Sequence, residues 1–173
     1  VTGADIGIHL NNVDFSTVKS DSAHSCGRYG IYLTSGADTN TVIDNVVIGN
    51  SNVNLFVSNS DFNTVENNYV KSAGVNGNIR LFSSKKNTVR KNTGLSGGDY
   101  GLWLDSANDN TVDTNTFNSN GQYGIFFNSG SDNIVYGNTC SSNSQIGVFS
   151  SSGSRNIIRQ NVITSNSQDG IRL

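Results

Sequence analysis

Apolar and polar positions repeat along this chain with a period of 23 or 24 residues. Each unit opens on a short apolar phrase, and in most units a glycine begins it. The phrase starts at Gly7, Gly30, Asn54, Asn78, Gly101, Gly124, Gly147 and Gly170. A period of this size is typical of stacked architectures, in which no single unit can bury its own apolar face. The sequence therefore predicts a solenoid.

Within each unit, apolar and polar residues alternate with a period of two, and helical spacing is nowhere sustained. Such alternation predicts short strands that turn one row of side chains inward. The inward rows form four columns, two from the first strand of each unit and one from each of the next two strands. In the first unit these columns begin at Ile8, Leu10, Val18 and Ala23.

Two asparagines stand five residues apart at fixed positions in each unit. Asparagine tolerates the left-handed backbone conformation, which suits it to corners between strands. Its amide also donates and accepts at once, so asparagines stacked coil on coil can form a hydrogen-bonded ladder. The two columns are Asn40, Asn63, Asn87, Asn110, Asn133 and Asn156, and Asn45, Asn68, Asn92, Asn115, Asn138 and Asn161.

Together these patterns predict an all-β fold, a parallel β-helix of about seven coils with three short strands per coil. The right-handed form is favoured because the six-residue rhythm of left-handed coils is absent. At about 4.8 Å per coil the stack is roughly 34 Å long. We expect residues 1–173 to form one domain, cut from a longer protein, because the chain starts and stops partway round a coil.

Composition excludes several classes of partner. The formal net charge is −2, so nothing points to nucleic acid, and there is no apolar run long enough for a membrane span. Cys26 and Cys140 lie five coils apart, too far for a mutual disulfide. Cys140 falls in an apolar column and is expected to be a core residue, whereas Cys26 could pair outside this chain.

The repeat unit resembles the NosD-type family of right-handed β-helix repeats, which also occurs in carbohydrate-binding and sugar-hydrolase modules. The units themselves carry the resemblance, such as Gly101-Leu-Trp-Leu followed by Asn110-Thr-Val and Asn115. It implies an extracellular, cell-surface or periplasmic protein that deals with polysaccharide or is built into a cell surface. Lyases, epimerases, hydrolases and non-catalytic proteins share this scaffold, so the resemblance fixes no activity.

Catalytic signatures of the wider group are missing. The motif of the mannuronan-epimerase-like members contains a proline, and this chain has none. Glycoside hydrolysis needs two carboxylates about 5 to 10 Å apart. Asp109 and Asp132 stand one coil apart at a corner, and we interpret them as a solvated column. No catalytic residues are therefore assigned.

No metal or cofactor is expected either. His24 and Cys26 form a His-x-Cys pair, but with no Met and only one other His the ligand set for a soft metal is incomplete.

One outward column is unusual, because it carries aromatic residues in five of seven coils. We expect it to lie in a line on one flat sheet, beside the column of opening glycines, and to expose several hundred square ångströms. This aromatic stripe consists of His9, Tyr32, Phe56, Arg80, Trp103, Phe126 and Phe149, of which all but His9 are candidate binding residues.

Three interpretations of the stripe stay open. A polysaccharide could lie along it, with sugars stacked on the ring faces. A protein surface could cover it instead, either a second copy of the chain or a neighbouring domain. Finally, the rings could simply stabilise the sheet by stacking on one another. Arg80, with Lys85, Lys86, Arg90 and Lys91, also makes the fourth coil basic, which would suit an acidic sugar or an acidic partner.

Two functions of different class follow. The first is a non-catalytic surface domain with a structural or adhesive role, which contacts protein or polysaccharide through the stripe. The alternative is a fragment of a polysaccharide lyase, epimerase or hydrolase whose catalytic residues lie outside these 173 residues. The absence of long inserted loops favours the first.

Overall fold

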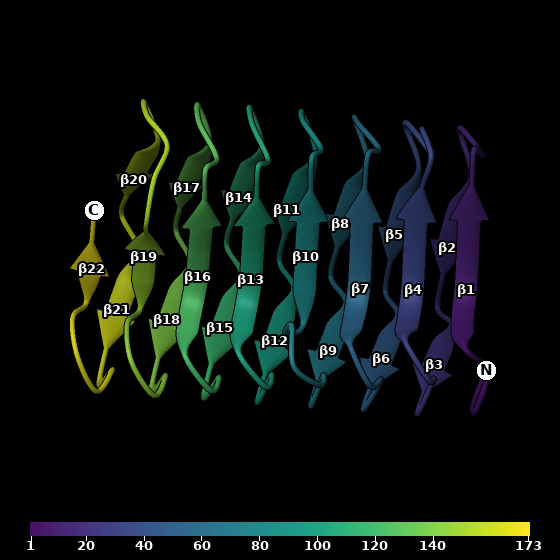
Figure 1. Cartoon of the computed structure of the whole chain (residues 1–173), viewed down its shortest axis with the longest axis horizontal. Helices are drawn as coiled ribbons and strands as arrows, with labels where there is room; N and C mark the ends of the chain where they lie inside the picture. Colours follow the sequence, from purple (N-terminus) through teal and green to yellow (C-terminus); the bar gives the residue numbers. More distant parts are fainter.

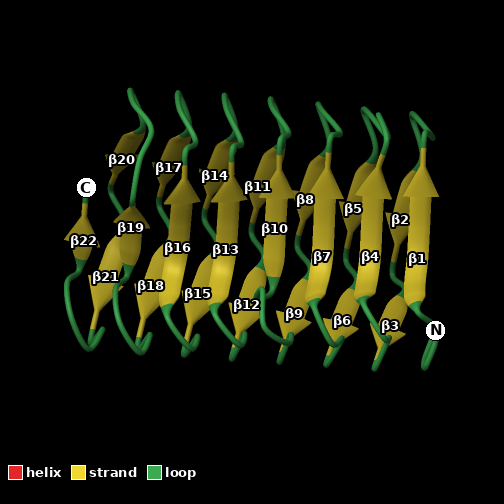
Figure 2. Ribbon diagram, in the orientation of Figure 1, coloured by secondary structure: helices red, strands yellow, loops and turns green.

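A computed structural model describes all residues, 1–173, and consists of strands and turns without any helix (Figure 2). No helix is therefore available to cross a membrane. The coils follow one another along the long axis from the N-terminal to the C-terminal end (Figure 1). Three parallel sheets run along this axis, of eight, seven and seven strands. The predicted β-helix of about seven coils, with three short strands per coil, is confirmed.

Each coil contributes one strand to each sheet. The first sheet contains β1 (Ile6–Asn11), β4 (Tyr29–Thr34), β7 (Val53–Ser58), β10 (Ile79–Phe82), β13 (Tyr100–Asp105), β16 (Tyr123–Asn128), β19 (Val148–Ser150) and β22 (Ile171–Arg172). The second contains β2 (Thr17–Lys19), β5 (Thr41–Ile43), β8 (Thr64–Glu66), β11 (Thr88–Arg90), β14 (Thr111–Asp113), β17 (Ile134–Tyr136) and β20 (Ile157–Arg159). The third contains β3 (Ser22–His24), β6 (Val46–Ile48), β9 (Tyr69–Lys71), β12 (Thr93–Leu95), β15 (Thr116–Asn118), β18 (Thr139–Ser141) and β21 (Val162–Thr164).

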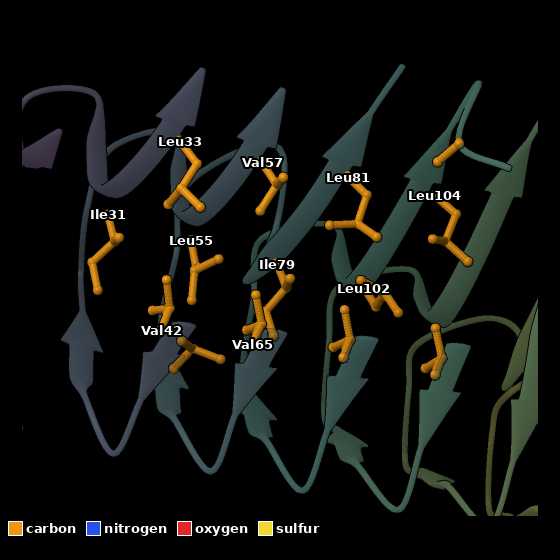
Figure 3. Close-up of a cluster of buried hydrophobic side chains, with 14 of the residues drawn as sticks. Ile31, Leu33, Val42, Leu55, Val57, Val65, Ile79, Leu81, Leu102 and Leu104 are labelled. Carbon is orange, nitrogen blue, oxygen red and sulfur yellow. The ribbon is translucent and has the colours of Figure 1, made fainter. Parts of the chain in front are cut away.

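The core is a single column of apolar side chains that runs the length of the solenoid. Leu and Ile side chains from the first sheet face a row of Val side chains from the second sheet, as Ile79 and Val65 illustrate (Figure 3). The third sheet contributes a mixed row that includes Val47, Phe117 and Cys140. Nearly all residues of the four predicted inward columns are buried, and those of the terminal coils, such as Ile8 and Ile163, are partly buried. The predicted core is confirmed.

Both predicted asparagine columns form continuous ladders, and Asn110 illustrates the geometry. Its Oδ1 accepts from the backbone NH and the Nδ2 of Asn87, at 2.9 and 3.2 Å. Its own NH and Nδ2 donate to Oδ1 of Asn133, at 2.9 and 3.1 Å, and Nδ2 also donates to the carbonyl of Ser84 at 3.1 Å. Ladder amides such as that of Asn110 thus satisfy their own polar atoms and the backbone at a corner, whereas Nδ2 of Asn63 is buried without a hydrogen-bond partner.

The left-handed backbone at these corners does not belong to the ladder asparagines, which corrects the expectation from sequence. It belongs to the residue immediately before, as in Thr39 (φ 57°) before Asn40 and Asp109 (φ 54°) before Asn110. The reason is that the left-handed residue turns the chain, and this turn aims the next side chain into the solenoid, where its amide is buried.

A third ladder, not anticipated from sequence, runs along the corner between the third and first sheets. It contains Asn50, Asn120, Asn143 and Asn166, but the equivalent positions in two middle coils are Ala73 and Gly97. Asn54 and Asn78 fill this gap from the opening position of the unit. Their amides link Asn50 to Asn120 through contacts of 2.6, 3.0 and 3.1 Å.

The opening glycines point inward, whereas the sequence pattern placed them beside the outward stripe. A Cβ on Gly101 would lie 2.6 Å from the carbonyl oxygen of Gly124 and 2.6 Å from Cβ of Phe117. The next residue, Leu102, is also buried. Two consecutive residues thus face the core at the start of each first-sheet strand. Only glycine, or an asparagine that joins the third ladder, fits at the first of them.

Candidate functional site

The aromatic stripe lies on the outer face of the first sheet, where the rings stack on one another coil by coil. His9 and Tyr32 have centroids 5.1 Å apart with 9° between their planes, and Tyr32 and Phe56 are 5.0 Å apart at 10°. Trp103, Phe126 and Phe149 continue the stack with separations of 6.2 and 5.4 Å. Parallel in-register pairing of the strands enforces this alignment.

Arg80 continues the stack rather than interrupting it. Its guanidinium carbon lies 3.9 Å from the ring centroid of Trp103 and 5.3 Å from that of Phe56. The same group donates to Oδ2 of Asp105 at 2.5 Å, and the side chains of this ion pair are only 18% and 10% exposed. The ring centroid of Phe82, from the same strand, lies 5.3 Å from the guanidinium carbon. The cation is thus held by rings and a carboxylate together.

The stripe exposes less apolar surface than the sequence suggested. Phe56 is buried at 6% exposure, and the other four rings from Tyr32 to Phe149 are half-buried. Because the rings stack face to face along the axis, neighbouring coils occupy their faces. Stacking of sugars on free ring faces is therefore not supported by this geometry, and a ligand on this sheet would meet ring edges.

A second aromatic row, missed in the sequence pattern, flanks the stripe. Tyr29, Tyr100 and Tyr123 immediately precede the opening glycines, and their rings lean against the stripe at centroid distances of 4.7 to 5.3 Å. Partial burial raises the pKa of the Tyr100 hydroxyl, which therefore stays protonated and can donate a hydrogen bond. Strict alternation would have placed this row inside, but the two consecutive inward residues turn it outward.

Polar side chains border the aromatic rows on both sides. One border includes Asp105 and Asn128, whose amide donates to Oδ1 of Asp105 at 3.2 Å. Along the other border, Gln122 donates to Oδ1 of Asp99 at 2.8 Å, and Asn76 donates to Oδ1 of Asn52. The face thus combines ring edges with hydroxyl, amide and carboxylate groups.

The other candidate chemistry does not assemble into a site. Asp132 is bound by the Arg155 guanidinium at 2.6 and 2.7 Å, and this hydrogen-bonded pair lowers the pKa of its carboxyl group. The column of Asp109 and Asp132 is therefore structural, as interpreted from sequence. No group of three or more His, Cys, Asp or Glu side chains is placed to hold a metal ion.

Both cysteines are free and fully buried, so no disulfide joins them. Cys140 belongs to the core as expected, and burial raises the pKa of its thiol to about 12. Cys26 donates weakly to the carbonyl of His24 at 3.6 Å, and its backbone NH donates to Asn50. A buried position does not support pairing of Cys26 with an outside partner.

A hollow in the surface lies by residues 150–156 and Leu173, and four of its eight lining residues are serines.

Comparison with solved structures gives the same fold at low sequence identity. The chain is similar to the periplasmic alginate epimerase AlgG, with a TM-score of 0.83 and 17% identity over 98% of this chain and 47% of that one. It is also similar to the DFA-IIIase of Arthrobacter chlorophenolicus A6 without its lid, with a TM-score of 0.80 and 18% identity over 97% and 47% of the two chains. The chain thus spans about half the length of these structures.

No curated protein matches the chain in sequence. The family model described as "Right handed beta helix region" matches residues 6–145 and again residues 74–173. The two matches overlap and together cover nearly the whole chain, which agrees with the repeat period, the three parallel sheets and the ladders. The predicted right-handed form is thereby confirmed, and this chain belongs to the right-handed β-helix family.

Proposed function

We propose that this domain is a non-catalytic, extracytoplasmic β-helix that holds a polysaccharide chain lengthwise along its first sheet. The observation that carries the proposal is the face itself, a continuous stack of aromatic rings and the Arg80 guanidinium, bordered on both sides by hydrogen-bonding groups. The face repeats once per coil, at about 4.8 Å, which is similar in scale to one sugar unit. The likeness to a periplasmic alginate epimerase supports polysaccharide in general as the ligand and a location outside the cytoplasm. The NosD-type kinship suggested by the repeat fits the same proposal.

The contact we propose is made by ring edges and hydrogen bonds. The tyrosine hydroxyls of Tyr100 and Tyr123 and the amides of Asn128 and Gln122 stand beside the stripe and can bond sugar hydroxyls. Ring edges then pack against the apolar parts of the sugars. Because the stacked side chains are already fixed, binding costs little conformational entropy on the protein side.

A non-catalytic role is supported by the carboxylates of this face. Asp105 is the only carboxylate within the strands of the first sheet, and it is committed to Arg80. Of the other aspartates that border this face, Asp5 and Asp169 are bound by Arg28 and Arg172, and only Asp99 has no ion pair. A single unpaired carboxylate does not supply the two that hydrolysis of a glycosidic bond requires. The enzyme-fragment alternative places the catalytic residues in further coils, which fits the half-length match to the two solved enzymes.

The test uses conservative changes that keep the rings. Tyr100→Phe with Tyr123→Phe removes two hydroxyls from the first sheet, and Tyr136→Phe removes one from the second sheet as the matched control. Each lost hydrogen bond costs about 1 kcal/mol, so we expect the double variant to bind at least about tenfold more weakly in glycan affinity electrophoresis. The control should bind like the wild type.

Removing whole rings is a poorer test, because the rings pack on one another and their loss would also lower stability. If the wild type is retained by no polysaccharide but sediments as a dimer that dissociates when the face is altered, a protein partner replaces the glycan. The apolar ring edges are the observation that favours this second candidate.

A further inference from the structure

The charges on the outer face of the first sheet are almost completely paired with one another. Each of the three arginines on this face is bound to an aspartate. The pairs are Arg28 with Asp5 at 2.5 Å, Arg80 with Asp105 at 2.5 Å, and Arg172 with Asp169 at 2.6 Å. Asp99 is a fourth aspartate, and it has only the amide of Gln122 as its partner. The face therefore carries no unpaired arginine or lysine and one aspartate in excess.

The Arg80 pair lies at the centre of the stripe and is fixed. Its guanidinium packs on Trp103 and Phe56, and neither side chain of the pair is more than 18% exposed. Turning Arg80 toward an outside anion would strip Asp105 of its partner in a partly desolvated position, which is strongly unfavourable. The cation is thus not available to a ligand.

The other basic residues of the fourth coil do not extend onto this face. Lys85 binds Asp61 at 3.8 Å, and Arg90 and Lys91 both bind Glu66, at 2.7 and 3.2 Å. Arg90 lies on the second sheet, and the lysines lie at its two corners. Lys86 has no ion pair and lies over the Phe62 ring, 5.2 Å from its centroid. The basic residues that the sequence suggested for an acidic sugar thus lie away from the first sheet, and Lys85, Arg90 and Lys91 are held in ion pairs.

We infer that the polysaccharide held by this face is a neutral one and not a uronic-acid polymer. The inference rests on the proposed function and adds the substrate class. A polyanion laid along the stripe would meet a slightly acidic surface, and association of like charges is disfavoured. The groups that can bond a ligand are uncharged, namely the hydroxyls of Tyr100 and Tyr123 and the amide atoms of Asn128 that its bond to Asp105 leaves over, and they match the hydroxyls of neutral sugars.

The experiment compares wild-type binding to two neutral probes, inulin and mixed-linkage β-glucan, and two acidic probes, alginate and polygalacturonate. Affinity electrophoresis at low and moderate salt measures each. We expect at least one neutral probe to bind at least tenfold more tightly than either acidic probe, with little dependence on salt. Preferential, salt-sensitive binding of alginate or polygalacturonate would show that the bound polysaccharide is not neutral, and it would leave the proposed polysaccharide-binding function intact. Retention of none of the four would overturn both.

A pair of charge variants tests the physical cause. Asp105→Asn frees Arg80 and removes one acidic group from the face, whereas Asp113→Asn makes the same charge change on the second sheet. We expect alginate binding to increase at least threefold at low salt for Asp105→Asn and to stay unchanged for Asp113→Asn. Far-UV circular dichroism establishes that both variants are folded. If both variants are folded and alginate binding changes equally in Asp105→Asn and Asp113→Asn, the Asp105 pair is not what keeps Arg80 from binding an acidic polysaccharide.

Discussion

A buried asparagine in this fold satisfies polar atoms on three successive coils at once. Asn110 both accepts from Asn87 and donates to Asn133, and it also caps the carbonyl of Ser84. An apolar residue of similar size at this position leaves those partners without hydrogen bonds inside the solenoid. The cost of a buried unsatisfied group is much larger than the net gain from an ordinary hydrogen bond.

We therefore expect Asn110→Leu to lower the free energy of unfolding by about 1 to 3 kcal/mol. Thr111→Val is the control, because its side chain lies on the outer face of the second sheet and it is adjacent in sequence; it should change stability by less than about 0.5 kcal/mol. Chemical denaturation of both variants measures the difference. Equal stability of the two would show that the ladder contributes nothing beyond its corner geometry.

At the scale of single residues, the sequence predicted the two main ladders but assigned the left-handed corners to the wrong residue. An asparagine at fixed phase fits either role, since it tolerates left-handed backbone and also stacks its amide. Only the register of the turn decides between them. The preceding positions hold Thr39, Asp44, Asp109 and others with no shared chemistry, so no pattern in the sequence marks them.

At the scale of strands and columns, strict alternation of inward and outward residues predicted the core correctly. It was wrong at one position, the opening glycine of each first-sheet strand. The inward columns of Ile31 and Leu33 follow a period of two, but Gly30 and Ile31 face inward together. This single irregularity turns Tyr29, Tyr100 and Tyr123 outward and creates the second aromatic row. The recurrence of tyrosine before glycine was the available signal, and it carries meaning only once the inward glycine is known.

The third ladder shows how columns compensate for one another. Asn78 occupies an opening position where most coils have glycine, and Gly97 stands where other coils have a ladder asparagine. A Cβ on Gly97 would lie 2.9 Å from Nδ2 of Asn78. The two positions therefore share one space, which holds one asparagine side chain.

This exchange predicts strong coupling between the two positions. Asn78→Gly should destabilise by about 1 to 3 kcal/mol by breaking the ladder, and Gly97→Asn should destabilise by a similar amount through overpacking. The double variant restores the arrangement found in other coils and should recover most of the stability. A double-mutant cycle in urea measures the coupling. Simple additivity of the two losses would rule out the shared space.

At the scale of the whole molecule, the core is one uninterrupted column, and both thiols are sealed in it. Cys140 has a pKa of about 12 because of burial, so at pH 8 it carries almost no reactive thiolate. Cys26 is also fully buried. We expect neither thiol to react with a disulfide reagent at pH 8 in the native protein, and both to react in concentrated denaturant.

The same measurement reports how the solenoid opens. Each coil contacts only its neighbours, so stability in such proteins is close to a sum over coils and interfaces. If reactivity of the two thiols rises at the same denaturant concentration as the loss of β-structure, the coils unfold as one unit. Rapid labelling of either thiol in native buffer would contradict the burial of that residue.

Function could be predicted from the sequence only in outline. The outward column from Tyr32 to Phe149 follows directly from the repeat. The face-to-face stacking of its rings does not, because it depends on the side-chain rotamers in neighbouring coils. The pairing of Arg80 with Asp105 was hidden for the same reason. The two residues are 25 positions apart, and they meet because neighbouring coils bring β10 and β13 side by side.

The ladders also bear on how such a chain can change length during evolution. Most asparagines in a ladder donate hydrogen bonds to the side-chain oxygen of the asparagine one coil further along. Duplicating a coil such as residues 101–123 would keep the ladder bonds in register, because each ladder amide would again face an asparagine in the next coil. The coils that carry Asn54 and Asn78 are different, because each relies on the other to bridge the third corner. These two coils must therefore be kept together, whereas the other coils can be duplicated or deleted one at a time without breaking a ladder.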